Sequence, residues 1–168
     1  MADANNDGRI SHDDLLRLVR YEAETGLFFA RARLSSLAGP GDALGTTDSR
    51  GYVSLRLKGR AYKAHRLAWF YVNGVWPDDG IDHADGRKSN NAISNLRPAT
   101  AAQNAQNSRV SNSDSTTGLL GVRAHKGKFQ AKICTGGRDE HLGTFVTPDE
   151  AHQAYVAAKR VRHEYGTL

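Results

Sequence analysis

The pattern of apolar and polar residues near the N-terminus predicts one short helix, one strand and a long loop. Residues 11–20 place leucines and a valine on one side of a helix, with Ser11 as its N-cap and two aspartates in its first turn. The apolar run at residues 27–29 favours a strand, and Gly26 ends the turn before it. Residues 35–50 are rich in Gly, Ser, Thr and Asp, so they predict a loop.

In the middle of the chain, the spacing of apolar residues changes from the period of two typical of strands to the period typical of helices. Apolar and polar residues alternate on both sides of Lys58-Gly59, which is typical of a β-hairpin. The predicted elements are strands at residues 52–57 and 60–64, helices at residues 65–72 and 99–108, and a turn-rich stretch at residues 76–98.

The C-terminal part predicts a small sheet followed by one helix. Thr147 is the expected helix cap, Pro148 occupies the first helical position and Glu150 completes a capping box. The predicted strands lie at residues 120–123, 128–133 and 141–145. The apolar stripe of the helix is expected from Ala151, Ala154, Tyr155, Ala158 and Val161.

Residues 109–117 have almost no apolar pattern and predict a linker between two modules. We therefore expect an α+β protein with a first module at residues 1–108 and a second module at residues 118–168.

The composition of the chain excludes some classes of protein and favours others. The 168 residues carry 23 Lys and Arg against 18 Asp and Glu, a formal net charge of +5, which favours a polyanionic partner. Cys134 is the single cysteine, so an internal disulfide framework and a zinc site built from several thiolates are excluded. The sequence shows no membrane-length apolar run and no secretory signal, and a cytoplasmic location is expected.

The first residues resemble a calcium-binding loop. Asp3, Asn5 and Asp7 take the first three ligand positions, Gly8 the sharp turn and Asp14 the last position. No entering helix precedes this loop, and its last ligand is Asp rather than the bidentate Glu. Calcium binding here stays an alternative to a polar leader that caps the first helix.

The stretch from Ile81 to Ser108 contains the residues best suited to chemistry. Asp82 and His83 are adjacent, and Asn104 follows 21 residues after His83. Hydrolysis of a phosphodiester needs a base to activate water and a cation to neutralise charge on the phosphate. Imidazole suits the base, and carboxylate and amide oxygens suit Mg²⁺. Because neighbouring residues of an extended segment point to opposite sides, Asp82 and His83 can serve metal and water separately.

This stretch resembles the HNH endonucleases of the phage homing type, whose active site has the ββα-metal (His-Me finger) fold. The resemblance covers about residues 10–108. It implies that His83 is the general base, that Asp82 and Asn104 bind a divalent metal ion such as Mg²⁺, and that Asn95 ties the β-hairpin together. Unlike the zinc-stabilised relatives, the chain has no paired cysteines in this region.

Upstream segments also resemble those that precede this nuclease core. They are residues 21–26, Gly51-Tyr52 and His65-Arg66-Leu67. The resemblance implies that Arg66 packs within the module or contacts a DNA phosphate.

The second module resembles the Apetala/ethylene-response-factor type of DNA-binding domain over about residues 117–166. In that fold the face of a three-stranded sheet enters the major groove of DNA. The resemblance implies a DNA-contacting face made of Arg123, Lys128, Gln130, Lys132 and His141. The sheet tryptophans of the plant members are missing from this module.

Together these patterns predict a metal-dependent endonuclease that cuts double-stranded DNA in a bacterial or phage-infected cell. No small-molecule cofactor and no membrane partner are expected. Two alternatives stay open: a non-catalytic DNA-binding regulator with a degenerate nuclease site, and a calcium-responsive interaction protein built on residues 3–14.

Overall fold

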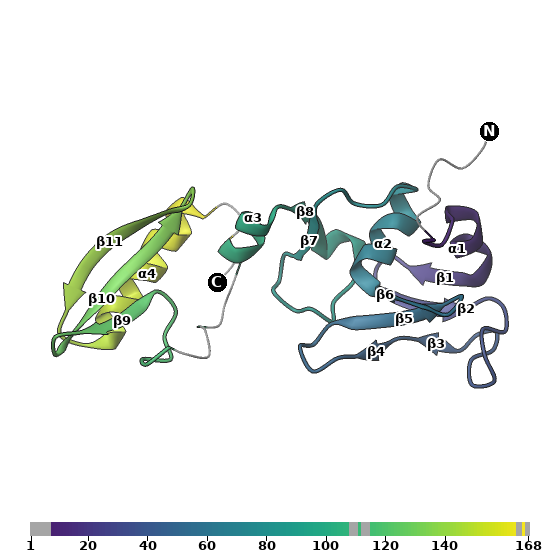
Figure 1. Ribbon diagram of the computed structural model, residues 1–168, viewed down its shortest axis with the longest axis horizontal. Coiled ribbons are helices and arrows are strands. Elements are labelled where there is room, and N and C mark those ends of the chain that lie inside the picture. The colour runs from purple at the N-terminus through teal and green to yellow at the C-terminus, as the bar shows by residue number, and fades with distance from the viewer. Residues whose placement is uncertain (1–7, 108–110, 112–114, 164–165, 167–168) are drawn as a thin grey trace. The chain divides into compact units, whose positions relative to one another are not determined.

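The computed structural model describes residues 8–107, 111, 115–163 and 166. They form two compact units (Figure 1). The first unit takes the described residues up to His83 together with Arg87–Pro98, and the second takes Ala84–Gly86 and the described residues from Ala99 onward. The modules predicted at residues 1–108 and 118–168 stay predictions. No described helix has the length and apolar character that crossing a membrane requires.

The first unit begins with a short helix and a small sheet. Ser11 caps helix α1 because its hydroxyl accepts a hydrogen bond from the Asp14 backbone N–H. The helix was expected to reach Arg20 but ends at Leu18, where the β-branched Val19 becomes extended and starts a strand. The elements are α1 (His12–Leu18), β1 (Val19–Glu22), β2 (Leu27–Ala30) and β3 (Ala43–Leu44), with the three strands in that order.

A second small sheet contains the predicted hairpin. Lys58 and Gly59 both have positive φ angles, 47° and 78°, as a two-residue hairpin turn requires. The predicted loop at residues 35–50 is wrong in part, because it contains β3 and another two-residue strand. The sheet consists of β4 (Thr46–Thr47), β5 (Val53–Leu57) and β6 (Arg60–Lys63), and its neighbours are antiparallel.

Helix α2 (Ala64–Asn73), predicted over residues 65–72, packs on these strands and ends at Gly74, which adopts the left-handed conformation that glycine allows. Leu67 and Ala68 of this helix are fully buried. They share one apolar core with Leu15, Phe28 and Leu57, so α1, both small sheets and α2 form a single scaffold.

The turn-rich stretch at residues 76–98 contains two strands that its pattern did not predict. They are β7 (Gly80–His83) and β8 (Leu96–Ala99), which form a two-stranded sheet, with the 3₁₀ turn η1 (Ile93–Asn95) just before β8. Strands of four residues rich in Asp, His, Arg and Pro carry no clear alternation, so their sequence resembles a loop. Helix α3 (Ala101–Gln106) follows with a capping box at Thr100, giving the chain order ββα.

The second unit contains a three-stranded antiparallel sheet and one long helix. Its elements are β9 (Val122–His125), β10 (Lys128–Thr135), β11 (Arg138–Phe145) and α4 (Pro148–Arg162), with β10 in the centre of the sheet. Thr147 and Glu150 form the predicted capping box. Helix α4 lies along one face of the sheet (Figure 1).

The helix-facing core of this unit includes Ala131, Ile133, Ala151 and Tyr155, all buried. One predicted member of the apolar stripe is wrong: Val161 is 85% exposed, whereas Lys159 is buried.

Candidate active site

Strand β7 places Asp82 and His83 next to each other, and both side chains are buried at 4% exposure. As expected for adjacent strand residues, they have different neighbours. Asp82 contacts Arg97 on β8, and His83 contacts residues of α2 and of the segment before η1. A carboxylate and an imidazole are thus fixed side by side on one short strand.

The carboxylate of Asp82 forms a partly buried ion pair with Arg97. Both the Nε and Nη2 atoms of the guanidinium donate to Oδ2 of Asp82, at 3.0 and 2.8 Å. Arg97 follows Asn95-Leu96 in the sequence, but nothing in this spacing identifies Asp82 as its partner. The contact holds the two strands of the hairpin together and places a positive charge at the proposed metal ligand.

The imidazole of His83 is held by one amide and two rings. Its Nε2 atom lies 3.2 Å from Oδ1 of Asn91. The ring of His65 lies edge-on to it with centroids 5.1 Å apart, and the ring of Tyr52 lies at 6.2 Å. A side chain with so many neighbours has little rotational freedom, which is what a group aimed at one substrate atom needs.

His65 is a second buried imidazole beside His83. Burial lowers its pKa to about 3, and the nearby charges of His83, Arg66 and Lys63 act in the same direction. Its Nδ1 atom is buried without a hydrogen-bond partner. At neutral pH His65 is therefore an uncharged packing partner of His83.

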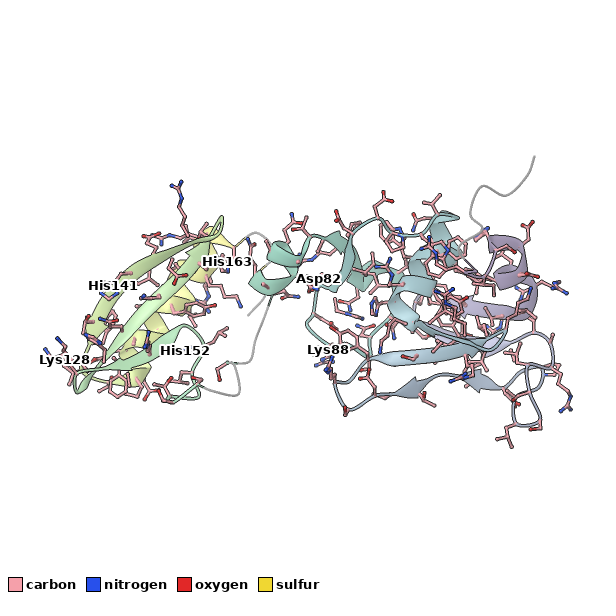
Figure 2. The ribbon with its side chains drawn as sticks, in the orientation of Figure 1. Asp82, Lys88, Lys128, His141, His152 and His163 are labelled. Atoms are coloured by element: carbon pink, nitrogen blue, oxygen red, sulfur yellow. The ribbon has the colours of Figure 1, made fainter. Side chains whose placement is uncertain are left out.

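Two lysines lie over the ring of Tyr52, which is also a neighbour of His83. The ammonium of Lys63 is 5.4 Å from the ring centroid and that of Lys88 is 4.9 Å from it. Lys63 also forms an ion pair with Asp48, and this contact lowers the pKa of Asp48 to about 2. Lys88 is exposed in the loop after β7, where Figure 2 labels it.

The remaining residues expected in the first site lie on three elements. Asn95 in η1 donates from Nδ2 to the carbonyl of Asn90 at 2.8 Å, within the connection that joins the two strands. Arg66 on α2 donates to the carbonyls of Pro77 and Asp79 at 2.9 and 3.0 Å, which fastens the chain between α2 and β7. Asn104 lies exposed on α3, in the second unit.

The residues expected to contact DNA lie mainly on the outer face of the second sheet, opposite α4. Arg123 pairs with Gln130, and Lys132 pairs with His141, across neighbouring strands. Lys128 lies beside the turn that joins β9 to β10, and Figure 2 labels it together with His141. Cys134 is on the same face and exposed.

A hollow of about 500 Å³ lies at the start of β9, beside Lys132 of β10. Arg123 and Lys132 line it together with the hydroxyl-bearing residues Ser111, Ser115 and Thr116. These five side chains can donate hydrogen bonds to an anion, and Leu119, Leu120 and Val122 make the rest of the lining largely apolar.

The donor atoms of Asp82 and Asn104 are hard oxygens, which fit Mg²⁺. Within the described part of the chain, no three His, Cys, Asp or Glu side chains gather in a way that could hold a metal ion. Of the calcium-loop residues, Asp3, Asn5 and Asp7 lie outside the described residues. Asp14 pairs with Lys58 and Arg17, which lower its pKa to about 2. Calcium binding there stays a prediction.

Comparison with known families gives a match over the ββα stretch and the helix before it. The family model described as HNH endonuclease matches residues 62–106. Residues 62–106 are thus similar to an HNH endonuclease domain. The match includes Asp82, His83 and Asn104 but does not reach the second sheet, for which no family match supports the Apetala/ethylene-response-factor type. No curated protein matches the chain.

Several residues of the HNH site were not predicted to act there. They are Tyr52, Lys63, Lys88, Asn91 and Arg97. Each meets Asp82, His83 or the ring of Tyr52 only through the tertiary structure, because the residue just before β5, the end of β6 and the loop after β7 come together there. A lysine or an asparagine in a loop gives no periodic signal that could have found them.

Proposed function

We propose that this protein is a metal-dependent endonuclease that hydrolyses phosphodiester bonds of double-stranded DNA. The observation that carries the proposal is the buried Asp82–His83 pair on β7, inside the segment that matches the HNH family. Two adjacent polar residues at 4% exposure are costly to bury, so a chain that needed only a stable β-hairpin would gain from apolar residues there.

In the proposed reaction His83 accepts a proton from a water molecule that attacks the scissile phosphorus. Asp82 and Asn104 would hold a divalent cation, which supplies positive charge next to the phosphate and its leaving 3′-oxygen. The product then carries a 5′-phosphate. His65, kept neutral by burial, adds no competing charge next to the base.

Lys88 and Lys63 would hold the DNA backbone at the HNH site. Both ammonium groups sit on the ring of Tyr52, whose other neighbours include His65 and His83. A phosphate placed between these lysines lies beside the proposed base without any contact to a base pair. Such contacts position the backbone but carry no sequence information.

The second unit would grip duplex DNA through the outer face of its sheet. Arg123, Lys128 and Lys132 supply the positive charge, and Gln130 and His141 supply groups that can reach base edges. The hollow lined by Arg123 and Lys132 suits a phosphate. This arrangement supports the Apetala/ethylene-response-factor interpretation of the module.

Cys134 offers a direct test of this face because it is the only cysteine of the chain and lies exposed on it. We expect duplex DNA to slow the alkylation of Cys134 by a maleimide at low salt, and high salt to abolish this protection. Equal alkylation rates with and without DNA at low salt would contradict the proposed face.

The biological role that we infer is of the homing type, in which a phage or bacterial endonuclease promotes the movement of its own gene. A nuclease of this type needs a rare target. We expect cleavage of a long random library to select one extended site, to which the second unit contributes. Cleavage without any preference would contradict a homing role but leave the nuclease activity in place.

One observation favours a second candidate, a non-catalytic DNA-binding regulator. Arg97 already places a cation at the carboxylate of Asp82, and a degenerate site would keep this ion pair for stability alone. In that case no divalent metal would promote cleavage, while binding of DNA by the outer sheet face would persist.

Nicking of supercoiled plasmid decides between the two candidates. We expect cleavage with Mg²⁺ that EDTA abolishes, no cleavage by Asp82→Asn, and unchanged cleavage by Asp78→Asn, which alters an exposed acid just before β7. Thermal melting of both variants checks that they fold. Metal-independent cleavage, or wild-type rates for folded Asp82→Asn, would contradict the proposed reaction.

A further inference from the structure

The orientation of the His83 imidazole depends on Asn91, a residue that is 2% exposed and lies eight positions later in the chain. The Asn91 side chain has two ends with different tasks. Its Nδ2 atom donates to the carbonyl of Ser89 at 3.0 Å, which turns Oδ1 toward His83. Because Oδ1 can only accept, Nε2 of His83 must donate the hydrogen bond between them.

This contact selects one form of the neutral imidazole. An imidazole with its proton on Nε2 carries its lone pair on Nδ1. The hydrogen-bond network therefore assigns Nδ1 as the basic atom of His83 and fixes the plane of the ring at the same time.

Asn91 is itself held from the N-terminal hairpin of the first unit. The hydroxyl of Tyr21 on β1 donates to the backbone carbonyl of Asn91 at 2.7 Å. Two residues later, the N–H of Ile93 donates to the carbonyl of Ala23 at 3.0 Å. Burial raises the pKa of Tyr21 to about 12, so its hydroxyl keeps the proton that it donates.

Gly26, in the turn of the same hairpin, lies against the same segment. Its φ of +74° suits glycine, and a Cβ atom at this position would lie 2.3 Å from the carbonyl carbon of Asn91 and from the backbone nitrogen of Ala92. The turn thus packs so closely on the Asn91 backbone that no side chain larger than that of glycine fits between them. The two hydrogen bonds and this contact fix the position of the Asn91 backbone.

We propose that Tyr21 is a positioning residue for the HNH site, acting through Asn91 on the orientation and tautomer of His83. This proposal rests on the proposed function, in which His83 is the general base. The β1–β2 hairpin lies outside residues 62–106, so the family match does not account for its contact with Asn91.

The variant Tyr21→Phe tests the proposal against a closely matched control, Tyr62→Phe. Both tyrosines are 8% exposed, and both use a buried hydroxyl, with Tyr62 accepting from the N–H of Ile10 at 2.9 Å. Each variant loses one buried hydrogen bond, so their melting temperatures are expected to fall by similar amounts. Of these two hydrogen bonds, only that of Tyr21 is made to Asn91, the residue that contacts His83.

We expect Tyr21→Phe to lower kcat for DNA cleavage about tenfold with little change in KM, because a small shift of the base costs rate without costing binding. Tyr62→Phe should keep the wild-type kcat. Equal values of kcat for the two variants would overturn the proposal. A parallel rise in KM for Tyr21→Phe alone would also overturn it, since Tyr21 would then act on DNA binding.

A second readout does not need catalysis. Nitrogen-15 NMR of the full chain at a pH where imidazoles are neutral reports the tautomer of each of the seven histidines, and the spectrum of His83→Gln assigns the signal of His83. We expect His83 to be protonated on Nε2 in the wild type and to become a mixture of tautomers in Asn91→Leu. The shift in Tyr21→Phe should be in the same direction and smaller, and Tyr62→Phe should show none.

A wild-type His83 protonated on Nδ1, or a tautomer unaffected by Asn91→Leu, would contradict the proposal whatever the nuclease assay shows. Conversely, a chain that cleaves no DNA but shows the expected tautomers would remove the proposed function and leave the Tyr21–Asn91–His83 linkage in place. The two failures are thus distinguishable.

Discussion

The HNH site of the first unit and the outer sheet face of the second unit use the same kinds of side chain in opposite ways. In the HNH site the polar groups are buried and paired: Asp82 and His83 are each 4% exposed and held by Arg97 and Asn91. On the sheet face Arg123, Lys128 and Lys132 are exposed and spaced by the β-ladder, which has a register shift between Ala131 and Lys132.

This difference corresponds to two physical tasks. A group that transfers a proton must keep one geometry, and burial among fixed neighbours removes the alternatives. A surface that contacts a flexible polyanion gains from long side chains that stay hydrated until counterions are released. Changes at the first site should therefore act on rate, and changes at the second on affinity and salt dependence.

The largest expected effect is the loss of the general base. His83→Ala should lower cleavage by at least about 10²-fold while binding of duplex DNA stays close to wild type. His152→Ala, on α4 of the second unit, is the control and should cleave normally. Cleavage rates and filter-binding affinities measured side by side check this, and wild-type-like cleavage by the folded His83 variant would remove the assignment.

Gly121→Ala should destabilise the second unit selectively. Gly121 has φ +76°, and a Cβ atom there would lie 2.0 Å from the ring of the buried Tyr155. We expect a loss of about 3 kcal/mol in the free energy of unfolding. Gly127→Ala is the matched control: its φ is +75° but no atom lies within 4 Å of the added Cβ, so only the backbone strain of about 1 kcal/mol remains.

Denaturant unfolding followed by hydrogen exchange at individual amides would locate these losses. If Gly121→Ala destabilised β7 as much as β10, the two units would not be energetically separate and the comparison would break down.

Lys132→Ala should weaken DNA binding in a salt-dependent way. If its ammonium replaces one condensed counterion, the slope of log affinity against log salt concentration flattens by about one unit. Gln130→Ala should instead change sequence preference with little change in slope. Arg160→Ala, exposed on α4, is the control with no expected effect. Unchanged slopes for Lys132→Ala would exclude a phosphate contact by this residue.

The smallest expected effect concerns acid stability of the first unit. His65 has a folded-state pKa of about 3, below the ordinary value of 6.5, so between these pH values the unfolded chain binds a proton that the folded chain does not. Stability attributable to His65 is therefore complete above about pH 6.5 and is lost as the pH falls, by about 2 kcal/mol between pH 7 and pH 5.

His65→Phe should remove this dependence and flatten the loss of stability on the acid side. Denaturant midpoints at pH 7 and pH 5 measure it, with the exposed His125→Phe as control. A variant whose midpoint falls as steeply as that of the wild type would show that His65 is not the titrating group.

Much of this protein follows from its sequence because the relevant signals are local. The caps of α1 and α4, the Lys58-Gly59 turn, the glycine that ends α2 and the strands of the second unit depend on neighbouring residues only. The adjacent Asp82 and His83, with Asn104 after them, were sufficient to indicate an HNH domain, which the match over residues 62–106 confirms.

Only the tertiary structure decided what surrounds those residues. Strands β7 and β8 are too short and polar for a period to be seen, and the partners of the site come from distant parts of the chain: Arg97 binds Asp82, Asn91 holds His83, and Tyr21 holds Asn91 from 70 positions away. Such contacts form because burial in one core forces each polar group to find a partner, and the identity of that partner depends on how helices and sheets pack rather than on spacing along the sequence.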